Sequence, residues 1–156
     1  MKTNRLLVVL LVALSASLAF AAGNGAWKKY KGQIIVSDAV IRTEYETDKE
    51  MIDGLAKARK QSLTKGADAE AWEVNFVAFL AKKPGPAGLS LVLYDSKRQF
   101  LTAKDIDVDA NAEILASSIT IGEDDGVKPG STVEIVLGRK AGGKETVFAK
   151  TKVTLK

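Results

Sequence analysis

Hydrophobic positions alternate with other positions along much of the chain, which is the pattern of β-strands. The longest run begins at Trp72, where residues 72, 74, 76, 78 and 80 share one face and residues 73, 75, 77, 79 and 81 share the other. Both faces are partly apolar beyond Asn75. This profile is typical of a central strand, and we expect a second sheet against one face and a helix against the other.

Six further apolar runs, each bounded by turn residues, are also predicted to be strands. They cover residues 33–42, 89–94, 99–104, 112–121, 131–137 and 146–155. In the last run, lysines at positions 150 and 152 alternate with apolar or small residues. That alternation is typical of a solvent-facing or edge strand that is protected against aggregation.

One segment has the period of a helix. Met51 and Leu55 belong to an apolar stripe at helical spacing, and Thr47-x-x-Glu50 fits a capping box at its start. The sequence therefore predicts a helix over about residues 48–61. A glycine inside this helix costs about 1 kcal/mol relative to alanine, so the helix needs its apolar face packed against the rest of the domain.

Seven short strands and one helix, inserted between the first two strands, predict a mainly β fold. We expect a single antiparallel β-sandwich of immunoglobulin-like architecture over residues 32–156. The immunoglobulin-like label rests on the number and spacing of the strands, because the chain has no cysteine and therefore no Cys…Trp…Cys pattern.

The first 21 residues have the three parts of a secretory signal peptide. Lys2 and Arg5 precede an apolar run, and small residues then lead to Ala19-Phe20-Ala21. We expect cleavage after Ala21 and export to a periplasm or to the outside of the cell. The alternative is a retained membrane anchor, although the uncharged stretch of 17 residues is at the short end of the spanning range.

The segment after the predicted cleavage site, residues 22–31, combines small, glycine-rich and basic residues without a sustained period. We expect it to be a flexible leader that docks on the domain only through Trp27 and Tyr30. Cleavage leaves 21 basic residues against 19 acidic ones, a net charge of +2, and the lysines are spread along the chain. A nucleic-acid partner normally requires a concentrated basic stripe, so none is expected, and no integral membrane segment is expected in the mature chain.

The chain has no histidine and no cysteine. Their absence excludes Ser-His-Asp and Cys-His nucleophiles, histidine acid–base catalysis, and zinc, copper or haem sites built on those ligands. The stretch Gly138 to Glu145 resembles a phosphate loop, but Glu145 replaces the magnesium-binding Ser or Thr and a strand pattern follows. We interpret it as a hairpin turn, and we expect neither an enzyme nor a resident cofactor.

Two acidic stretches suggest the one exception, a weak calcium site. The first alternates Asp with other residues like the start of a calcium loop, but Ala110 replaces the required Gly and Ala116 replaces the closing Glu. The second stretch, residues 123–125, would have to lie at the same end of the sandwich as residues 105–109 for both stretches to supply ligands. The candidate ligands are Asp105, Asp107, Asp109, Glu123, Asp124 and Asp125.

The aromatic residues separate into two groups. Those within predicted strands are expected in the core or half-buried, namely Trp72, Phe76, Phe100 and Phe148. Trp27, Tyr30 and Tyr45 lie outside predicted structure and are candidates for contact with a partner. The alternative, which we favour for the tail tryptophan, is that it packs back onto its own sheet. The leading interpretation is an exported, non-enzymatic module that binds an envelope or extracellular protein through sheet edges or loops. The alternative is a weak calcium- or carbohydrate-binding module, and the oligomeric state is left open.

Overall fold

The computed structural model describes residues 24–156, so the predicted signal peptide, residues 1–21, lies outside the described residues. Strands dominate, and the prediction of a mainly β fold is confirmed. The elements are α1 (Asn24–Tyr30), β1 (Ile34–Ser37), α2 (Asp48–Ala58), β2 (Ser62–Leu63), β3 (Ala71–Phe79), β4 (Leu89–Tyr94), β5 (Phe100–Ile106), β6 (Ile114–Gly122), the short 3-10 helix η1 (Glu123–Asp125), β7 (Ser131–Ala141) and β8 (Lys144–Leu155). No helix in this part of the chain is long and apolar enough to cross a membrane.

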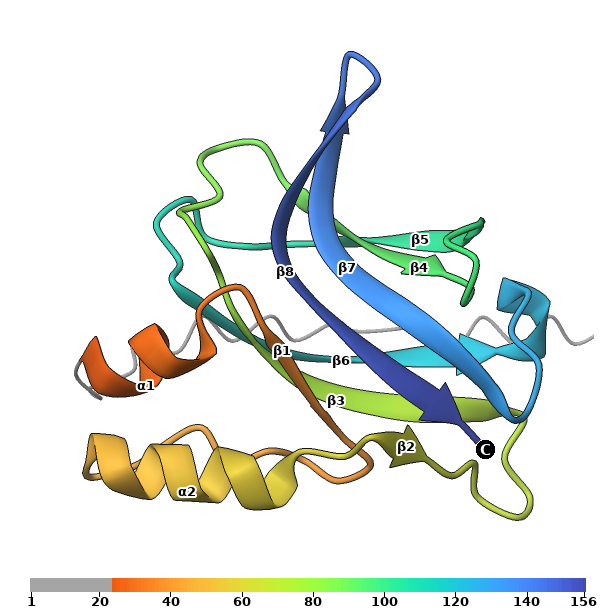
Figure 1. The fold of residues 1–156 in the computed structure, drawn as a ribbon, viewed down its shortest axis with the longest axis horizontal. Helices are drawn as coiled ribbons and strands as arrows, with labels where there is room; N and C mark the ends of the chain where they lie inside the picture. The colour runs from red at the N-terminus through yellow and green to blue at the C-terminus, as the bar shows by residue number, and fades with distance from the viewer. Residues whose placement is uncertain (1–23) are drawn as a thin grey trace, which may run out of the picture.

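The strands form two sheets (Figure 1). One has the order β1-β3-β6 and the other has the order β2-β8-β7-β4-β5. Neighbouring strands are antiparallel except for β2 and β8, which are parallel. The prediction of seven strands in a wholly antiparallel sandwich is therefore wrong in its details, because the short β2 adds a parallel pair. The immunoglobulin-like arrangement is not confirmed.

The main core lies between the two sheets. Trp72 and Phe76 of β3 pack there with Leu91 of β4 and Phe148 of β8, and all four are buried. The opposite face of β3 places Val77 and Phe79 in a second cluster with both helices. β3 is therefore covered on both faces, which is why both faces of its sequence are apolar. The prediction of a second sheet against one face and a helix against the other is confirmed.

The two helices lie together on the outer face of the three-stranded sheet (Figure 1). Met51 and Leu55 supply the buried face of α2, as predicted. Part of the expected flexible leader is instead α1, whose Tyr30 is buried against the ring of Phe79, with 5.3 Å between the ring centroids. Docking through Tyr30 agrees with the prediction, whereas the helix itself was not predicted. A helix this short gains little from propensity, so its packing supplies most of its stabilisation.

Several element ends differ from the predictions because long-range contacts redirect the chain. The strand predicted to reach residue 42 ends at Ser37, and Val40 is 85% exposed. The helix predicted to reach residue 61 ends at Ala58, since the amide of Lys60 donates to the carbonyl of Val36 at 2.9 Å. The turn predicted at residues 138–145 is shorter, because β7 and β8 remain paired up to Ala141 and Lys144.

The five-stranded sheet is linked to the three-stranded sheet along one side. The amide of Lys150 in β8 donates to the carbonyl of Gly32 at 3.1 Å, and the amide of Ala81 donates to the carbonyl of Phe148 at 2.7 Å. β8 therefore lies between β7 and other backbone segments rather than at a bare edge, although Lys150 and Lys152 face solvent as predicted.

Candidate functional site

The six acidic residues predicted as calcium ligands are engaged by other groups or exposed singly. Asp105 accepts a hydrogen bond from the hydroxyl of Ser90, and Asp109 accepts one from the amide of Asn111. Lysines pair with two more: Glu123 with Lys65 and Asp125 with Lys104, both at 3.1 Å, while Asp107 and Asp124 are exposed. Within residues 24–156, no three His, Cys, Asp or Glu side chains gather as a metal site.

The three aromatic residues predicted to contact a partner have different surroundings. Tyr30 is buried and its hydroxyl donates to the carbonyl of Ile52 at 3.2 Å, so it serves the fold and not the surface. Trp27 is half-buried, with the ammonium of Lys31 4.5 Å from its ring centroid. Tyr45 is half-buried and lines an open pocket.

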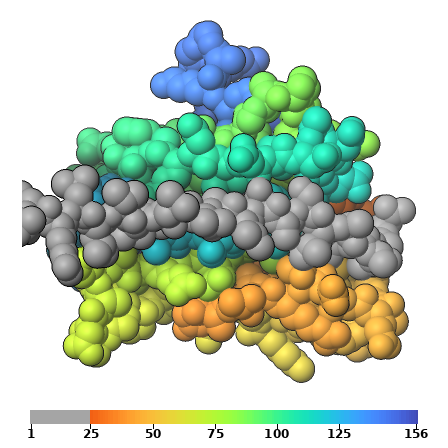
Figure 2. All heavy atoms as spheres, turned by 180° about the vertical axis from the view of Figure 1, so that it is seen from behind, coloured from red at the N-terminus to blue at the C-terminus, as the bar shows by residue number. Residues whose placement is uncertain are grey.

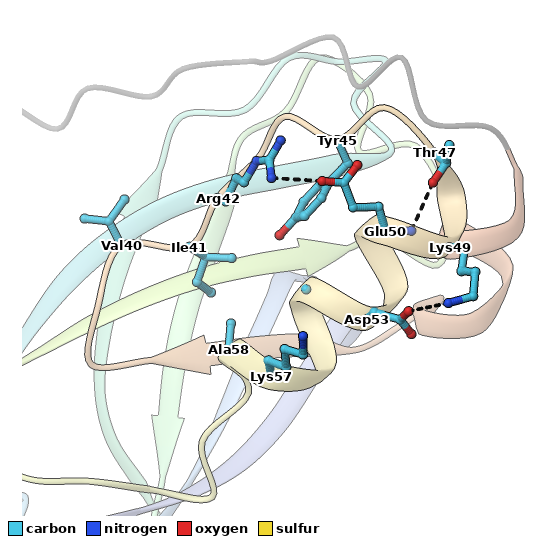
Figure 3. A pocket seen from close by; sticks show the side chains of 11 residues that line it. Val40, Ile41, Arg42, Tyr45, Thr47, Lys49, Glu50, Asp53, Lys57 and Ala58 are labelled. Atoms are coloured by element: carbon cyan, nitrogen blue, oxygen red, sulfur yellow. Dashed lines mark hydrogen bonds and ion pairs between the residues drawn. The ribbon is translucent and has the colours of Figure 1, made fainter.

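This open pocket, of about 550 Å³, lies between α2 and the segment that follows β1 (Figure 3). Figure 3 shows Tyr45 between Arg42 and α2, and burial raises the pKa of the phenol. The Arg42 guanidinium contacts Glu50 at 2.9 Å, and Lys49 contacts Asp53 at 2.8 Å. Since a cation of the same pocket engages each carboxylate, the pocket is a charge-compensated surface rather than a pair of carboxylates poised for acid–base chemistry.

A smaller pocket, of about 230 Å³, lies on the outer face of the five-stranded sheet and was not predicted from the sequence. Val92 and Ala103 are directly paired across β4 and β5 and line its apolar part. The hairpin of β7 and β8, which projects from the body of the molecule (Figure 2), supplies the opposite wall. The lining residues are Ser90, Val92, Tyr94, Phe100, Ala103, Gly138, Arg139, Lys140 and Glu145. We call it the outer-face pocket.

Phe100 forms one side of the outer-face pocket and is 63% exposed, so the prediction that it is in the core or half-buried is wrong. The reason is a register shift between Leu93 and Tyr94, after which Tyr94 pairs with Phe100. Simple alternation along the strand does not reveal such a shift. The rings of Tyr94 and Phe100 meet edge to face, with 6.5 Å between their centroids, and together they form an aromatic wall.

The carboxylate of Glu145 joins the projecting hairpin to β4. It accepts a hydrogen bond from the Tyr94 hydroxyl at 2.5 Å and contacts the Arg98 guanidinium at 3.1 Å. That hydrogen bond, followed by burial and by the negative charge of Glu145, raises the pKa of Tyr94. Because both oxygens of Glu145 are engaged, this residue holds the two walls of the pocket together.

Arg98 extends this network at the cost of an unfavourable backbone conformation. Within residues 24–156 it is the only residue other than glycine with a positive φ, at 61°. Its guanidinium lies 3.5 Å from the carboxylate of Glu134, a residue only 9% exposed, as well as contacting Glu145. A hairpin turn of this kind favours glycine at such a position, so the side-chain contacts of Arg98 offset the cost.

The other wall of the outer-face pocket is held by Arg139. Its guanidinium donates to the carbonyls of Pro84, at 2.7 Å, and of Ala87 and Gly88 in the loop before β4. Lys140, the next residue, is exposed. The pocket thus has an apolar floor on the paired strands β4 and β5, an aromatic wall held by the contacts of Glu145, and a charged rim.

No protein-family model, curated protein or solved structure matches this chain. Its function is therefore inferred from the residues and geometry described above.

Proposed function

We propose that this protein is an exported, non-enzymatic recognition module that binds a protein partner in the periplasm or outside the cell. The observation that carries the proposal is the exposed ring of Phe100 beside the pre-formed outer-face pocket. Sites for small molecules usually have about 300–1,000 Å³, so a pocket of about 230 Å³ suits a single inserted side chain better than a small-molecule ligand.

The lining chemistry indicates what the partner inserts. An apolar floor at Val92 and Ala103 beside the rings of Tyr94 and Phe100 favours an apolar or aromatic side chain. Protein interfaces typically have such an anchor in a desolvated pocket with a polar rim around it. Lys140 and the hydroxyl of Ser90 supply polar groups for that rim.

The network around the pocket supports binding over catalysis. Histidine and cysteine are absent from the chain, and the one carboxylate in the pocket, Glu145, is engaged by Tyr94 and Arg98. Such contacts keep the walls in place before a partner arrives, which reduces the entropy cost of association. Export rests on the signal peptide pattern of residues 1–21.

The experiment that tests this proposal is capture of a partner by residues 22–156 from envelope and secreted fractions of the source cells, at low and high salt. Phe100→Ala is the test variant, and Val40→Ala is the matched control, since Val40 is the other exposed large hydrophobic residue of the described chain. We expect the parent and Val40→Ala to retain a partner at both salt concentrations. Phe100→Ala should bind that purified partner at least about tenfold more weakly, as an anchor residue worth about 1.4 kcal/mol would.

Two outcomes would contradict the proposal: no partner retained at either salt concentration, or equal affinity for the parent and Phe100→Ala. Urea denaturation provides the folding control. Because the Phe100 side chain is largely exposed and its contact is the edge-to-face pair with Tyr94, its removal should lower the free energy of unfolding by no more than about 1 kcal/mol.

A further inference from the structure

A second surface feature is separate from the outer-face pocket. It is a groove of about 440 Å³ between β8 and the end of α2. Every charged residue that lines it, all within the described chain, is cationic: Arg59, Lys60, Lys150 and Lys152. The other lining residues are Gln33, Gln61, Thr132, Thr151, Val153 and Thr154. We call it the basic groove.

Tertiary structure creates the basic groove from distant parts of the chain. The parallel pairing of β2 with β8, with the amide of Thr154 donating to the carbonyl of Gln61 at 3.0 Å, brings the segment after α2 alongside β8. The guanidinium of Arg59 donates to the side-chain oxygen of Gln33 at 2.7 Å, which orients it at the groove. The four cations therefore share one concave surface, although Arg59 and Lys60 are far from Lys150 and Lys152 in the sequence.

The charge of this groove stands out against that of the chain. The predicted mature chain has a net charge of only +2, yet four positive charges lie in this one groove. Among the described residues, the carboxylate within 4.0 Å of a groove cation is that of Glu134, which is 4.0 Å from Lys150 and is also shared with Arg98. Like charges gathered in a concave surface raise the local positive potential and concentrate anions there.

The spacing and the neutral lining groups narrow the class of anion. Lys150 and Lys152 are two residues apart on one strand, so they share a face and their backbones lie about 6.6 Å apart. A row of cations at this spacing suits an extended chain that carries repeated negative groups. The hydroxyls of Thr132 and Thr154 hydrogen-bond to each other at 2.9 Å, and their remaining hydrogen-bonding capacity, with the amide side chain of Gln61, can serve sugar hydroxyls.

Two other polyanions fit the groove less well. Its lining residues include no aromatic side chain, whereas single-stranded nucleic acid is usually bound by stacking on aromatic rings. Neither of the exposed large hydrophobic residues of the described chain, Val40 and Phe100, lines the groove, so its lining offers no exposed large apolar side chain for insertion into a lipid surface. We propose that the basic groove binds a linear acidic polysaccharide that carries carboxylate or sulfate groups.

The test measures the affinity of residues 22–156 for alginate and for dextran sulfate by isothermal titration calorimetry at increasing salt, with neutral dextran as the blank. The variant Lys150→Gln/Lys152→Gln removes two charges from the groove. The matched control Lys83→Gln/Lys97→Gln removes two charges from exposed residues that do not line it. We expect an affinity that falls with salt, an at least tenfold loss in the groove variant and less than a twofold loss in the control.

A second groove variant, Arg59→Gln/Lys60→Gln, keeps the test valid if substitution on β8 disturbs folding, and thermal denaturation checks each protein. Equal losses in groove and control variants would overturn the proposal, because they would indicate attraction by net charge alone. So would the absence of binding to both polysaccharides, or tighter binding to polyglutamate, a single-stranded oligonucleotide or anionic vesicles. Phe100→Ala should leave polysaccharide binding unchanged, which separates this proposal from the recognition of a protein partner.

Discussion

The ring of Tyr45 lies against Gly54 of α2, so close that a Cβ at position 54 would be 2.6 Å from the Cε1 atom of Tyr45. This contact explains a glycine in the interior of a helix, where it costs about 1 kcal/mol relative to alanine. The missing side chain lets the segment after β1 approach α2 and form a wall of the open pocket in Figure 3.

The contact predicts that Gly54→Ala depends on its partner. In the parent protein we expect no gain in the free energy of unfolding, because the added methyl group displaces the ring of Tyr45. In a Tyr45→Ala background the same substitution should stabilise the protein by about 1 kcal/mol, the ordinary difference in helix propensity. Urea denaturation of the four proteins measures this coupling, and an equal effect of Gly54→Ala in both backgrounds would refute it.

Arg98 provides a prediction about backbone strain. Arg98→Ala should lower the free energy of unfolding, because alanine keeps the unfavourable positive φ and loses the contacts to Glu134 and Glu145. Arg98→Gly loses the same contacts but relieves the strain, so it should be more stable than Arg98→Ala by about 1 kcal/mol. Equal stabilities of the two variants in urea would show that the turn does not impose the positive φ.

Tyr94 provides a prediction about pH. Its pKa is raised by the hydrogen bond to Glu145, by burial and by the charge of that carboxylate, so the folded state holds the phenol proton more tightly than the unfolded state does. The resulting stabilisation is complete below the unfolded pKa of about 10 and is lost as the pH rises through the folded value. The pKa of Tyr94 in Glu145→Gln should move back towards the ordinary value.

The measurement is the near-ultraviolet absorbance titration of each protein, with Tyr94→Phe as the reference that isolates the signal of Tyr94. Urea denaturation at increasing pH measures the effect on stability, and the parent should lose free energy of unfolding more steeply than Tyr94→Phe as the pH rises above about 10. An unchanged titration of Tyr94 in Glu145→Gln would contradict the assigned cause.

Tyr30 tests whether α1 is part of the domain. Burial of this ring against Phe79 predicts that Tyr30→Ala costs about 3 kcal/mol or more in the free energy of unfolding. Tyr30→Phe should cost about 1 kcal/mol, because it removes only the hydrogen bond to the carbonyl of Ile52. Lys28→Ala, at an exposed position of the same helix, should have little effect. If Tyr30→Ala left the free energy of unfolding unchanged, the result would instead support the interpretation of residues 22–31 as a flexible leader.

Features that depend on local periodicity were predicted well. The strand predicted over residues 89–94 coincides with β4, and the two apolar faces of β3 meet a sheet on one side and the helices on the other. Thr47 is the N-cap of α2 and accepts from the amide of Glu50 at 3.1 Å, as the capping box predicts. The second half of that box differs, because the Glu50 carboxylate accepts from the amide of Glu46.

The candidate sites depended on contacts between distant segments, and the outer-face pocket was not predictable from sequence periodicity. One signal was present: Tyr94 and Phe100 lie on either side of the four residues that separate the strands predicted at residues 89–94 and 99–104. What places both rings beside the β7–β8 hairpin is the register shift in β4 and β5, together with the contacts of Glu145. The acidic stretches were conspicuous in sequence, yet lysines, a serine hydroxyl and backbone amides engage four of the six candidate ligands.

By itself, the sequence determined that this chain folds mainly as β-strands with a capped helix, and that its chemistry excludes histidine and cysteine. Those properties follow from composition and from periods of two and 3.6 residues, which act over a few neighbouring positions. Only the tertiary structure decided that α1 docks, that Phe100 is exposed and that Lys150 shares a groove with Arg59. Each of these depends on strand register and on long-range packing, whose free energy comes from residues far apart in the chain.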